Sequence, residues 1–371
     1  MKIWWHKIKN LPGYLSQLRQ SQPFRNSELN FFERNLKRSI FQSQPMVLQL
    51  ELTNSCNLKC LSCGHSYWDK SINQPRFIQQ STIDELNAII PFFSELLIGG
   101  YGEPTLHPKF SDILSYFRRD EHLKISMITN GTLLHKHMDC LDQFNTIILS
   151  MDGVGDIYEK HRKISFSKFS DQLENLCKYR EGLSKGVKAW QGPFNLEVNL
   201  VWNKATHGSI PETLNFLSNY PVTRIHLLPE KMYDFSRKEE SLFHLRHLHQ
   251  VYTDLRLWQR EFKMKIEFPN FLKYELPCNQ PLDMVFMLSN GELMACCSAI
   301  FHGHNHRFSL GKLLDFDGSF SKLWNQPSMR KFRKARFGEG DYPEPCKGCA
   351  FRYVNNSNLY RDLSIPVNRN V

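Results

Sequence analysis

Three cysteines lie within eight residues in the first part of the chain: Cys56, Cys60 and Cys63, with the spacing Cys-x3-Cys-x2-Cys. A structural zinc site needs four ligands, and the nearest histidine that could be the fourth is His65. A redox pair needs only a Cys-x2-Cys spacing. A four-iron cluster normally takes four thiolates, so three of them would leave one iron open to a ligand or substrate. The residues alone leave zinc, redox and iron–sulfur chemistry open.

A second group of cysteines lies toward the end of the chain. It offers enough thiols to ligate a zinc ion or a second iron–sulfur cluster in full: Cys278, Cys296, Cys346 and Cys349. Cys297 is adjacent to one of them and is an alternative ligand. The pair Asn290–Gly291 predicts a tight hairpin just before this position. Cys140 and Cys177 belong to neither group and are predicted to be ordinary buried thiols.

The composition is that of a globular protein. The chain has 371 residues, of which 41% are hydrophobic and 23% charged, enough for one large domain and a smaller one. We see no secretory signal and no run of about 18 apolar residues, so we expect a cytoplasmic protein without a membrane span. In the reducing cytosol, clustered cysteines more often hold metal or carry out redox chemistry than form disulfides.

Positive charge is concentrated in two segments. The chain has 47 Lys and Arg against 37 Asp and Glu, a net charge of +10. Much of the excess lies in residues 1–44 and in the run MRKFRKARF at 329–337. Either these are solvated faces or they contact an anionic partner. The basic arm contains Trp4 and Trp5, and such a segment either makes peripheral contact with a membrane surface or packs against the barrel.

Short apolar runs alternate with amphipathic runs, which predicts parallel strands joined by crossover helices. The predicted strands are 47–52, 95–100, 124–129, 146–150, 196–202 and 224–229. Helices are predicted near 109–119, 167–179, 245–262 and 82–93, the last of them opened by the capping pair Thr82 and Glu85. In an open or partial barrel of this kind, functional residues lie at the carboxyl ends of the strands. We therefore expect the cysteine motif and the segments after the next three strands to meet on one rim.

Four segments, taken in order, resemble the radical S-adenosylmethionine (SAM) superfamily over roughly residues 45–235: the cysteine motif, GGYGEP at 99–104, TNG at 129–131 and SMDG at 150–153. The resemblance implies a partial (β/α)6 barrel with a four-iron cluster on Cys56, Cys60 and Cys63. It implies that the open iron binds SAM and that one electron splits SAM to give a 5′-deoxyadenosyl radical, which abstracts hydrogen from a substrate. Ser62 departs from the family, which usually has an aromatic residue there.

Matched residue by residue, the resemblance also implies a set of contacts to SAM: Gly102, Glu103, Asn130, Ser150 and Asn199. Glu103, with the Gly102 backbone, stands where the family holds the methionine ammonium, a task that suits a fixed carboxylate. Asn130 and Ser150 stand at strand ends that contact the ribose or the carboxylate. The three polar residues Asn130, Ser150 and Asn199 could equally serve a turn or a strand end.

The segment after the hairpin resembles SPASM-type extensions, which carry auxiliary iron–sulfur clusters. It has fewer cysteines than the full pattern and is most similar to the shorter twitch form. The resemblance implies a second four-iron cluster on the C-terminal cysteines, with zinc as the alternative. The predicted organisation is a basic arm at 1–44, the radical SAM barrel at 45–235, a connecting helical segment at 236–270, the auxiliary-cluster domain at 271–350 and a tail at 351–371.

We expect a radical SAM oxidoreductase, or a related enzyme, that modifies a carbohydrate-like small molecule while the auxiliary cluster accepts an electron. The alternative is modification of a peptide or protein, although residues 1–44 are shorter than the leader-recognition domain that peptide modifiers often carry. An alternative of another class is a zinc-stabilised nucleic-acid-binding protein, which would not need the Glu103 motif. The expected partners are a small-molecule or peptide substrate and a one-electron donor such as flavodoxin or ferredoxin, with no nucleic acid.

Overall fold

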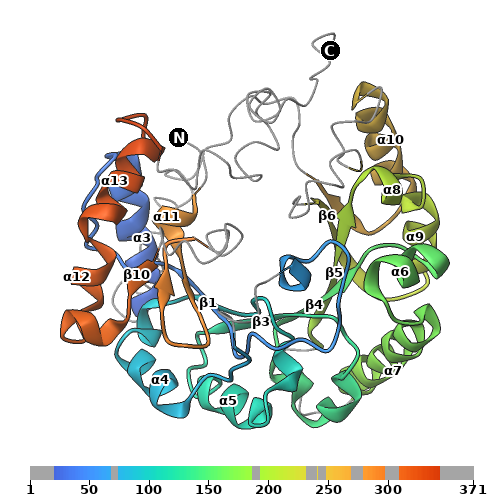
Figure 1. Ribbon diagram of the computed structural model, residues 1–371, viewed down its shortest axis with the longest axis horizontal. Helices are drawn as coiled ribbons and strands as arrows, with labels where there is room; N and C mark the ends of the chain where they lie inside the picture. Colours follow the sequence, from blue (N-terminus) through green and yellow to red (C-terminus); the bar gives the residue numbers. More distant parts are fainter. Residues whose placement is uncertain are drawn as a thin grey trace.

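The computed structural model describes residues 21–67, 74–185, 193–230, 240, 248–268, 279–296 and 309–342. These residues form a ten-stranded sheet in the order β10-β9-β8-β1-β2-β3-β4-β5-β6-β7. The strands from β8 through β1 to β7 pair in parallel, whereas β8–β9 and β9–β10 are antiparallel. Figure 1 shows the sheet as an open arc with helices on its outer side, so the predicted partial barrel is confirmed and the barrel is not closed.

All six predicted strands are present, within two residues at each end: β1 (Val47–Leu50), β2 (Glu95–Ile98), β3 (Lys124–Thr129), β4 (Thr146–Met151), β5 (Asn195–Trp202) and β6 (Val222–Pro229). Four further strands extend the sheet: β7 (Lys265–Glu267), β8 (Met284–Met287), β9 (Leu293–Met294) and β10 (Ser309–Gly311). The hairpin predicted at Asn290–Gly291 joins β8 to β9, and Gly291 takes a φ of +82°, which a residue without a side chain adopts without strain.

Alternate residues of each strand turn outward and are fully buried, as Leu48 and Leu50 of β1 and Leu96 and Ile98 of β2 show. They pack against the outer layer of helices: α4 (Gln80–Asp84), α5 (Phe110–Phe117), α6 (Gly155–Arg162), α7 (Phe166–Lys185), α8 (Lys204–His207), α9 (Ile210–Leu217) and α10 (Leu248–Glu261). The remaining residues of each strand face the inside of the arc and are the ones available to a site.

The helix predicted near 82–93 is wrong in form. The segment is a short α4 followed by the 3₁₀ turns η2 (Glu85–Ala88) and η3 (Ile90–Phe92), and the residue that caps α4 is Gln79 rather than Thr82. Pro91 explains part of the difference, because it lacks an N–H and disfavours the α conformation of the residue before it. The predicted apolar stripe is nevertheless buried: Leu86, Ile89, Ile90 and Phe93.

Part of the predicted basic arm is a structural element. Residues Gln22–Asn35 form α3, which contacts α11 (Gln280–Asp283), and α11 in turn contacts α13 (Pro327–Arg336). Figure 1 draws these helices and α12 (Phe320–Trp324) at one end of the arc. Asn30 Nδ2 donates to Leu282 O at 2.8 Å, and Arg34 pairs with Asp283 at 2.6 Å. Residues 1–20, which include the two tryptophans, lie outside the described residues. No helix in the described part of the chain has both the length and the apolar character to cross a membrane.

The second basic run, 329–337, is not wholly a solvated face. Arg333 of α13 is fully buried, and its guanidinium carbon lies 4.4 Å from the ring centroid of Phe41 and 4.6 Å from that of Trp324. It donates to the carbonyl oxygens of Ser39 and Pro281 at 3.1 Å. One charge of this run therefore joins the N-terminal segment to the C-terminal helices.

Candidate functional site

The cysteine motif occupies the loop between β1 and the 3₁₀ turn η1 (Gly64–Tyr67), at the carboxyl end of β1. Cys60 is buried, and Cys56 and Cys63 are half-buried. Backbone N–H of Glu103, after β2, donates to Ser55 O at 2.8 Å. Side-chain Nδ2 of Asn130, after β3, donates to Asn57 Oδ1 at 2.9 Å. The predicted meeting of the motif loop with the segments after β2 and β3 is thus present as direct contacts.

The glycines after β2 are required for this close approach. A Cβ added at Gly102 would lie 2.2 Å from Thr53 O and 2.4 Å from Ser55 O, both in the backbone of the motif loop. A Cβ added at Gly100 would lie 2.7 Å from the Glu51 carboxylate. The glycine run therefore lets two loops pack backbone to backbone, and a side chain at Gly102 would push the cysteine loop away.

The Glu103 carboxylate is a buried junction between neighbouring strand ends. Its Oε1 accepts from Thr105 N at 3.2 Å, Thr105 Oγ1 at 2.6 Å and Thr129 Oγ1 at 2.7 Å, and its Oε2 accepts from Asn130 N at 2.8 Å. Burial raises the pKa of this carboxyl group, and the hydrogen bonds oppose that rise. Oε2 keeps acceptor capacity for one further donor. The free acceptor position on Oε2 is compatible with the predicted contact between Glu103 and a methionine ammonium. That contact stays a prediction.

Ser150 and Asn199 face the inside of the arc in one row. In the strand register Ser150 of β4 pairs with Asn199 of β5, which pairs with His226 of β6. The His226 ring lies between two carboxylates, with Nε2 2.8 Å from Glu197 and Nδ1 3.2 Å from Glu267. The inner face of β4, β5 and β6 is therefore polar, and the SAM contacts predicted for Ser150 and Asn199 remain predictions.

The three thiols have the surroundings that an iron–sulfur cluster needs. Burial raises the pKa of Cys56 to about 12 and that of Cys63 to about 11, and it also raises the pKa of Cys60, so a metal must take the place of each proton. Leu58 N lies 3.5 Å from Cys56 Sγ, and Arg162 Nη1 lies 3.7 Å from Cys60 Sγ. Cluster thiolates are stabilised by such donors, so the donor set fits the group that the resemblance implies.

The sequence analysis missed three residues beside Cys60. Asp152 and Arg162 form a buried ion pair with 2.8 Å between Oδ2 and Nε, and Tyr158 of α6 is fully buried next to them. Asp152 belongs to the SMDG segment that the sequence analysis singled out, from which only Ser150 was chosen. Arg162 and Tyr158 lie on the following helix, and nothing in their spacing relates them to the cysteines.

The C-terminal cysteine group is described only in part. Cys296 is buried directly after β9, and its Sγ donates to Gln280 Oε1 at 2.9 Å. Three of its predicted co-ligands, Cys278, Cys346 and Cys349, lie outside the described residues, as does Cys297, so this ligand set remains a prediction. Within the described ranges, no group of three or more His, Cys, Asp and Glu side chains is arranged to hold a single metal ion. Cys140 and Cys177 are buried, as predicted.

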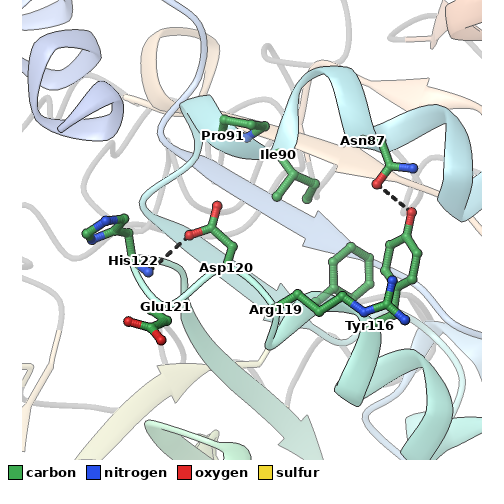
Figure 2. Close-up of a pocket in the computed structure, with 9 residues that line it drawn as sticks. Asn87, Ile90, Pro91, Tyr116, Arg119, Asp120, Glu121 and His122 are labelled. Atoms are coloured by element: carbon green, nitrogen blue, oxygen red, sulfur yellow. Dashed lines mark hydrogen bonds between the residues drawn. The ribbon is translucent and has the colours of Figure 1, made fainter. Parts of the chain in front are cut away.

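Two cavities lie away from these residues. One of about 480 Å³ is on the outer surface, between the η2–η3 segment and the end of α5, and Figure 2 shows Tyr116 there donating to Asn87. The other, of about 630 Å³, is lined by residues at the amino ends of the strands, among them Glu95, Lys124 and Arg224. None of the predicted site residues lines either cavity.

Comparison with known families gives the class of protein. Residues 50–189 match the radical SAM superfamily, and residues 278–350 match SPASM, an iron–sulfur cluster-binding domain. The chain therefore carries a radical SAM domain followed by a SPASM domain, as the resemblance predicted. The two domains imply four-iron clusters and SAM as cofactors, which agrees with the prediction.

Three similar proteins illustrate the relationship. The tungsten-containing aldehyde ferredoxin oxidoreductase cofactor-modifying protein of Pyrococcus furiosus is 26% identical over 193 residues, 49% of this chain and 51% of that protein, so the chain spans about half of its length. The subtilosin biosynthesis protein AlbA of Bacillus subtilis is 23% identical over 338 residues, 85% of this chain and 70% of that protein. The SAM-bound crystal structure of SuiB from Streptococcus suis superposes with a TM-score of 0.60 over 90% of this chain and 78% of SuiB, at 16% identity, and shares the fold.

Proposed function

We propose that this radical SAM enzyme is a maturase that modifies a peptide or protein substrate. The observation that carries the proposal is the alignment with AlbA, a bacteriocin biosynthesis protein, because it covers 85% of the chain and so most of both domains. SuiB, which shares the fold, has also been crystallised with its precursor peptide SuiA. The comparisons therefore support the alternative of the sequence analysis better than its first choice, the carbohydrate-like small molecule.

Most of the predicted residues have a task in this proposal. Cys56, Cys60 and Cys63 hold the cluster, which when bound supplies the electron that opens SAM to radical chemistry. Glu103 fixes the rim between the strand ends and keeps one acceptor position toward the ligand. The polar inner wall at Ser150 and Asn199 orients the ligand, while the helices outside the sheet exclude water from that side. Cys278, Cys296, Cys346 and Cys349 hold the second cluster.

The cluster assignment is tested by anaerobic reconstitution with iron and sulfide. The Cys56, Cys60 and Cys63 triple Ala variant is expected to lose about four iron atoms per chain relative to the unsubstituted protein and to stop releasing 5′-deoxyadenosine from SAM with dithionite. The matched control replaces two other buried thiols of the same chain, Cys140 and Cys177, and should keep both properties. A colourless protein that binds zinc and leaves SAM intact would contradict the proposal and favour the nucleic-acid-binding alternative.

The substrate class needs a separate experiment. Short peptides encoded beside the gene are synthesised and incubated anaerobically with reconstituted protein, SAM and a reduced flavodoxin. A peptide whose mass changes only with SAM and only with the intact cysteine motif supports a maturase. Modification of a sugar or cyclitol under the same conditions, with every peptide unchanged, would return the carbohydrate-like substrate to first place.

A further inference from the structure

The C-terminal end of helix α6 contacts the cysteine loop. The helix follows β4 directly, and its last residues reach the loop between Cys56 and Cys63. Leu61 N donates to His161 O at 2.8 Å, so the residue after Cys60 is hydrogen-bonded to the end of α6. Residues of α6 thereby become the close neighbours of one particular cysteine, Cys60.

The guanidinium of Arg162 is aimed at this cysteine by an ion pair. Its Nη2 donates to Asp152 Oδ1 at 3.1 Å, and its Nε lies 2.8 Å from Asp152 Oδ2, so the two groups form a close ion pair. The remaining nitrogen, Nη1, lies 3.7 Å from Cys60 Sγ. Asp152 is 1% exposed and Arg162 8%, so solvent screens this charge only weakly.

The Tyr158 hydroxyl is a second donor at the same place. It is fully buried and has no hydrogen-bond partner in the described part of the chain. Tyr158 precedes Arg162 by four residues on α6, so the two side chains share one face of the helix. A buried hydroxyl without an acceptor is unfavourable, and a sulfur-rich cluster on Cys60 would supply the acceptor.

We propose that Arg162 and Tyr158 are positioning residues that raise the reduction potential of the SAM-binding cluster through Cys60. The reduced cluster carries one more negative charge than the oxidised cluster. The Asp152–Arg162 pair turns its positive end, Arg162 Nη1, toward Cys60 Sγ, so this end and the Tyr158 hydroxyl stabilise the reduced form. The consequence is that a small one-electron carrier can reduce the cluster before SAM is opened. This inference rests on the proposed function, because it requires a cluster on Cys56, Cys60 and Cys63.

The test is a potentiometric titration of reconstituted protein followed by electron paramagnetic resonance. The signal to follow is the one whose shape changes when SAM is added, which separates this cluster from the second one. Arg162→Met is expected to lower the midpoint potential, Arg162→Lys to lower it less because the charge remains, and Tyr158→Phe to lower it by the smallest amount. Arg224→Met on β6 and Tyr116→Phe on α5 are matched controls that remove the same groups elsewhere and should leave the potential unchanged.

The outcomes separate this inference from the proposed function. Unsubstituted protein with no SAM-responsive cluster would refute the proposed function itself. A cluster whose potential stays the same in Arg162→Met, or shifts equally in Arg224→Met, would overturn the inference alone. If Arg162→Met takes up no iron, the midpoint potentials of Tyr158→Phe and Arg162→Lys test the inference instead. Reduced iron content with an unchanged potential in those two variants would show a purely structural role and would also overturn it.

Discussion

Replacement of Glu103 by Gln tests whether this carboxylate joins the strand ends of the rim. The substitution keeps the shape of the side chain but turns one acceptor oxygen into an NH₂ donor. The amide oxygen can stay with the donors that now reach Oε1, from Thr105 and Thr129. In that orientation the new NH₂ group faces Asn130 N–H, which now donates to Oε2 at 2.8 Å, and two donors meet.

The expected loss of stability follows from that one broken contact. A hydrogen bond to a charged acceptor contributes about 1.5–3 kcal/mol, and the orphaned Asn130 N–H adds about 1–3 kcal/mol. Part of this is returned, because burial raises the Glu103 pKa and the neutral amide avoids the cost of burying a charge. We therefore expect a net loss of about 2 kcal/mol in the free energy of unfolding. In the opposite orientation the NH₂ group would face Thr105 N, also a donor, and the hydroxyls of Thr105 and Thr129 would have to turn from donors into acceptors.

Urea unfolding of the metal-free protein measures the loss, and hydrogen exchange measures its location. The amide of Asn130 should exchange faster in Glu103→Gln than in the unsubstituted protein. Glu95→Gln is the matched control at the start of β2, the strand that precedes Glu103, since among the described residues the Glu95 carboxylate accepts one long hydrogen bond, from Ser126 Oγ at 3.5 Å. A loss below about 0.5 kcal/mol, or unchanged exchange at Asn130, would refute the account of Glu103 as a junction.

Three further predictions follow from the packing and charge of the chain. Gly102→Ala should abolish iron uptake, because its Cβ would lie 2.2 Å from Thr53 O, whereas Gly182→Ala in α7 meets nothing within 4 Å and should keep full iron content. Burial raises the pKa of Glu95, so the folded state binds this proton more tightly than the unfolded chain. The unsubstituted protein should therefore become more stable relative to Glu95→Gln as the pH falls through the raised pKa toward 4.5, and less stable as the pH rises. Urea midpoints of both proteins at several pH values measure this difference, and a difference that grows with rising pH would contradict the prediction. Arg333→Met keeps the apolar bulk but leaves buried carbonyl oxygens without a donor, so it should lower the free energy of unfolding by about 4 kcal/mol, and a thermal midpoint within error of the unsubstituted protein would count against the contact.

Local pattern sufficed for the strands and for the rim. Each of the six strands is a short apolar run, with burial that repeats every second residue in β1, β2 and β4, and parallel pairing brings the segments after the strands to one edge. The helix near 82–93 shows where local pattern fails. Its apolar stripe was identified correctly, but Pro91 breaks the hydrogen-bonding ladder and the segment becomes 3₁₀ turns around the same buried side chains.

The local sequence pattern did not predict contacts between distant parts of the chain. Strand β8 pairs with β1 although more than two hundred residues separate them, and this pairing attaches the SPASM domain to the barrel sheet. The buried Glu51 carboxylate is a single residue that makes such contacts between distant parts of the chain. It accepts from Tyr101 N at 3.0 Å and from Ser289 Oγ at 2.9 Å, and so links the glycine motif to the hairpin before Cys296. No periodicity in the sequence indicates such a partner.

The sequence by itself determined the class of chemistry, because the spacing of Cys56, Cys60 and Cys63 is a local property of eight residues and the later motifs follow it in order along the chain. The spacing alone left zinc, redox and iron–sulfur chemistry open, and the order of the motifs carried the resemblance that chose between them. Only the tertiary structure decided what surrounds those cysteines. Asp152 and Arg162 reach Cys60 because a strand and a helix bring residues roughly a hundred positions away back to the loop. Burial, charge and hydrogen bonds act through space, so the electrostatic surroundings of a thiolate are fixed by the fold and not by the spacing of the ligands.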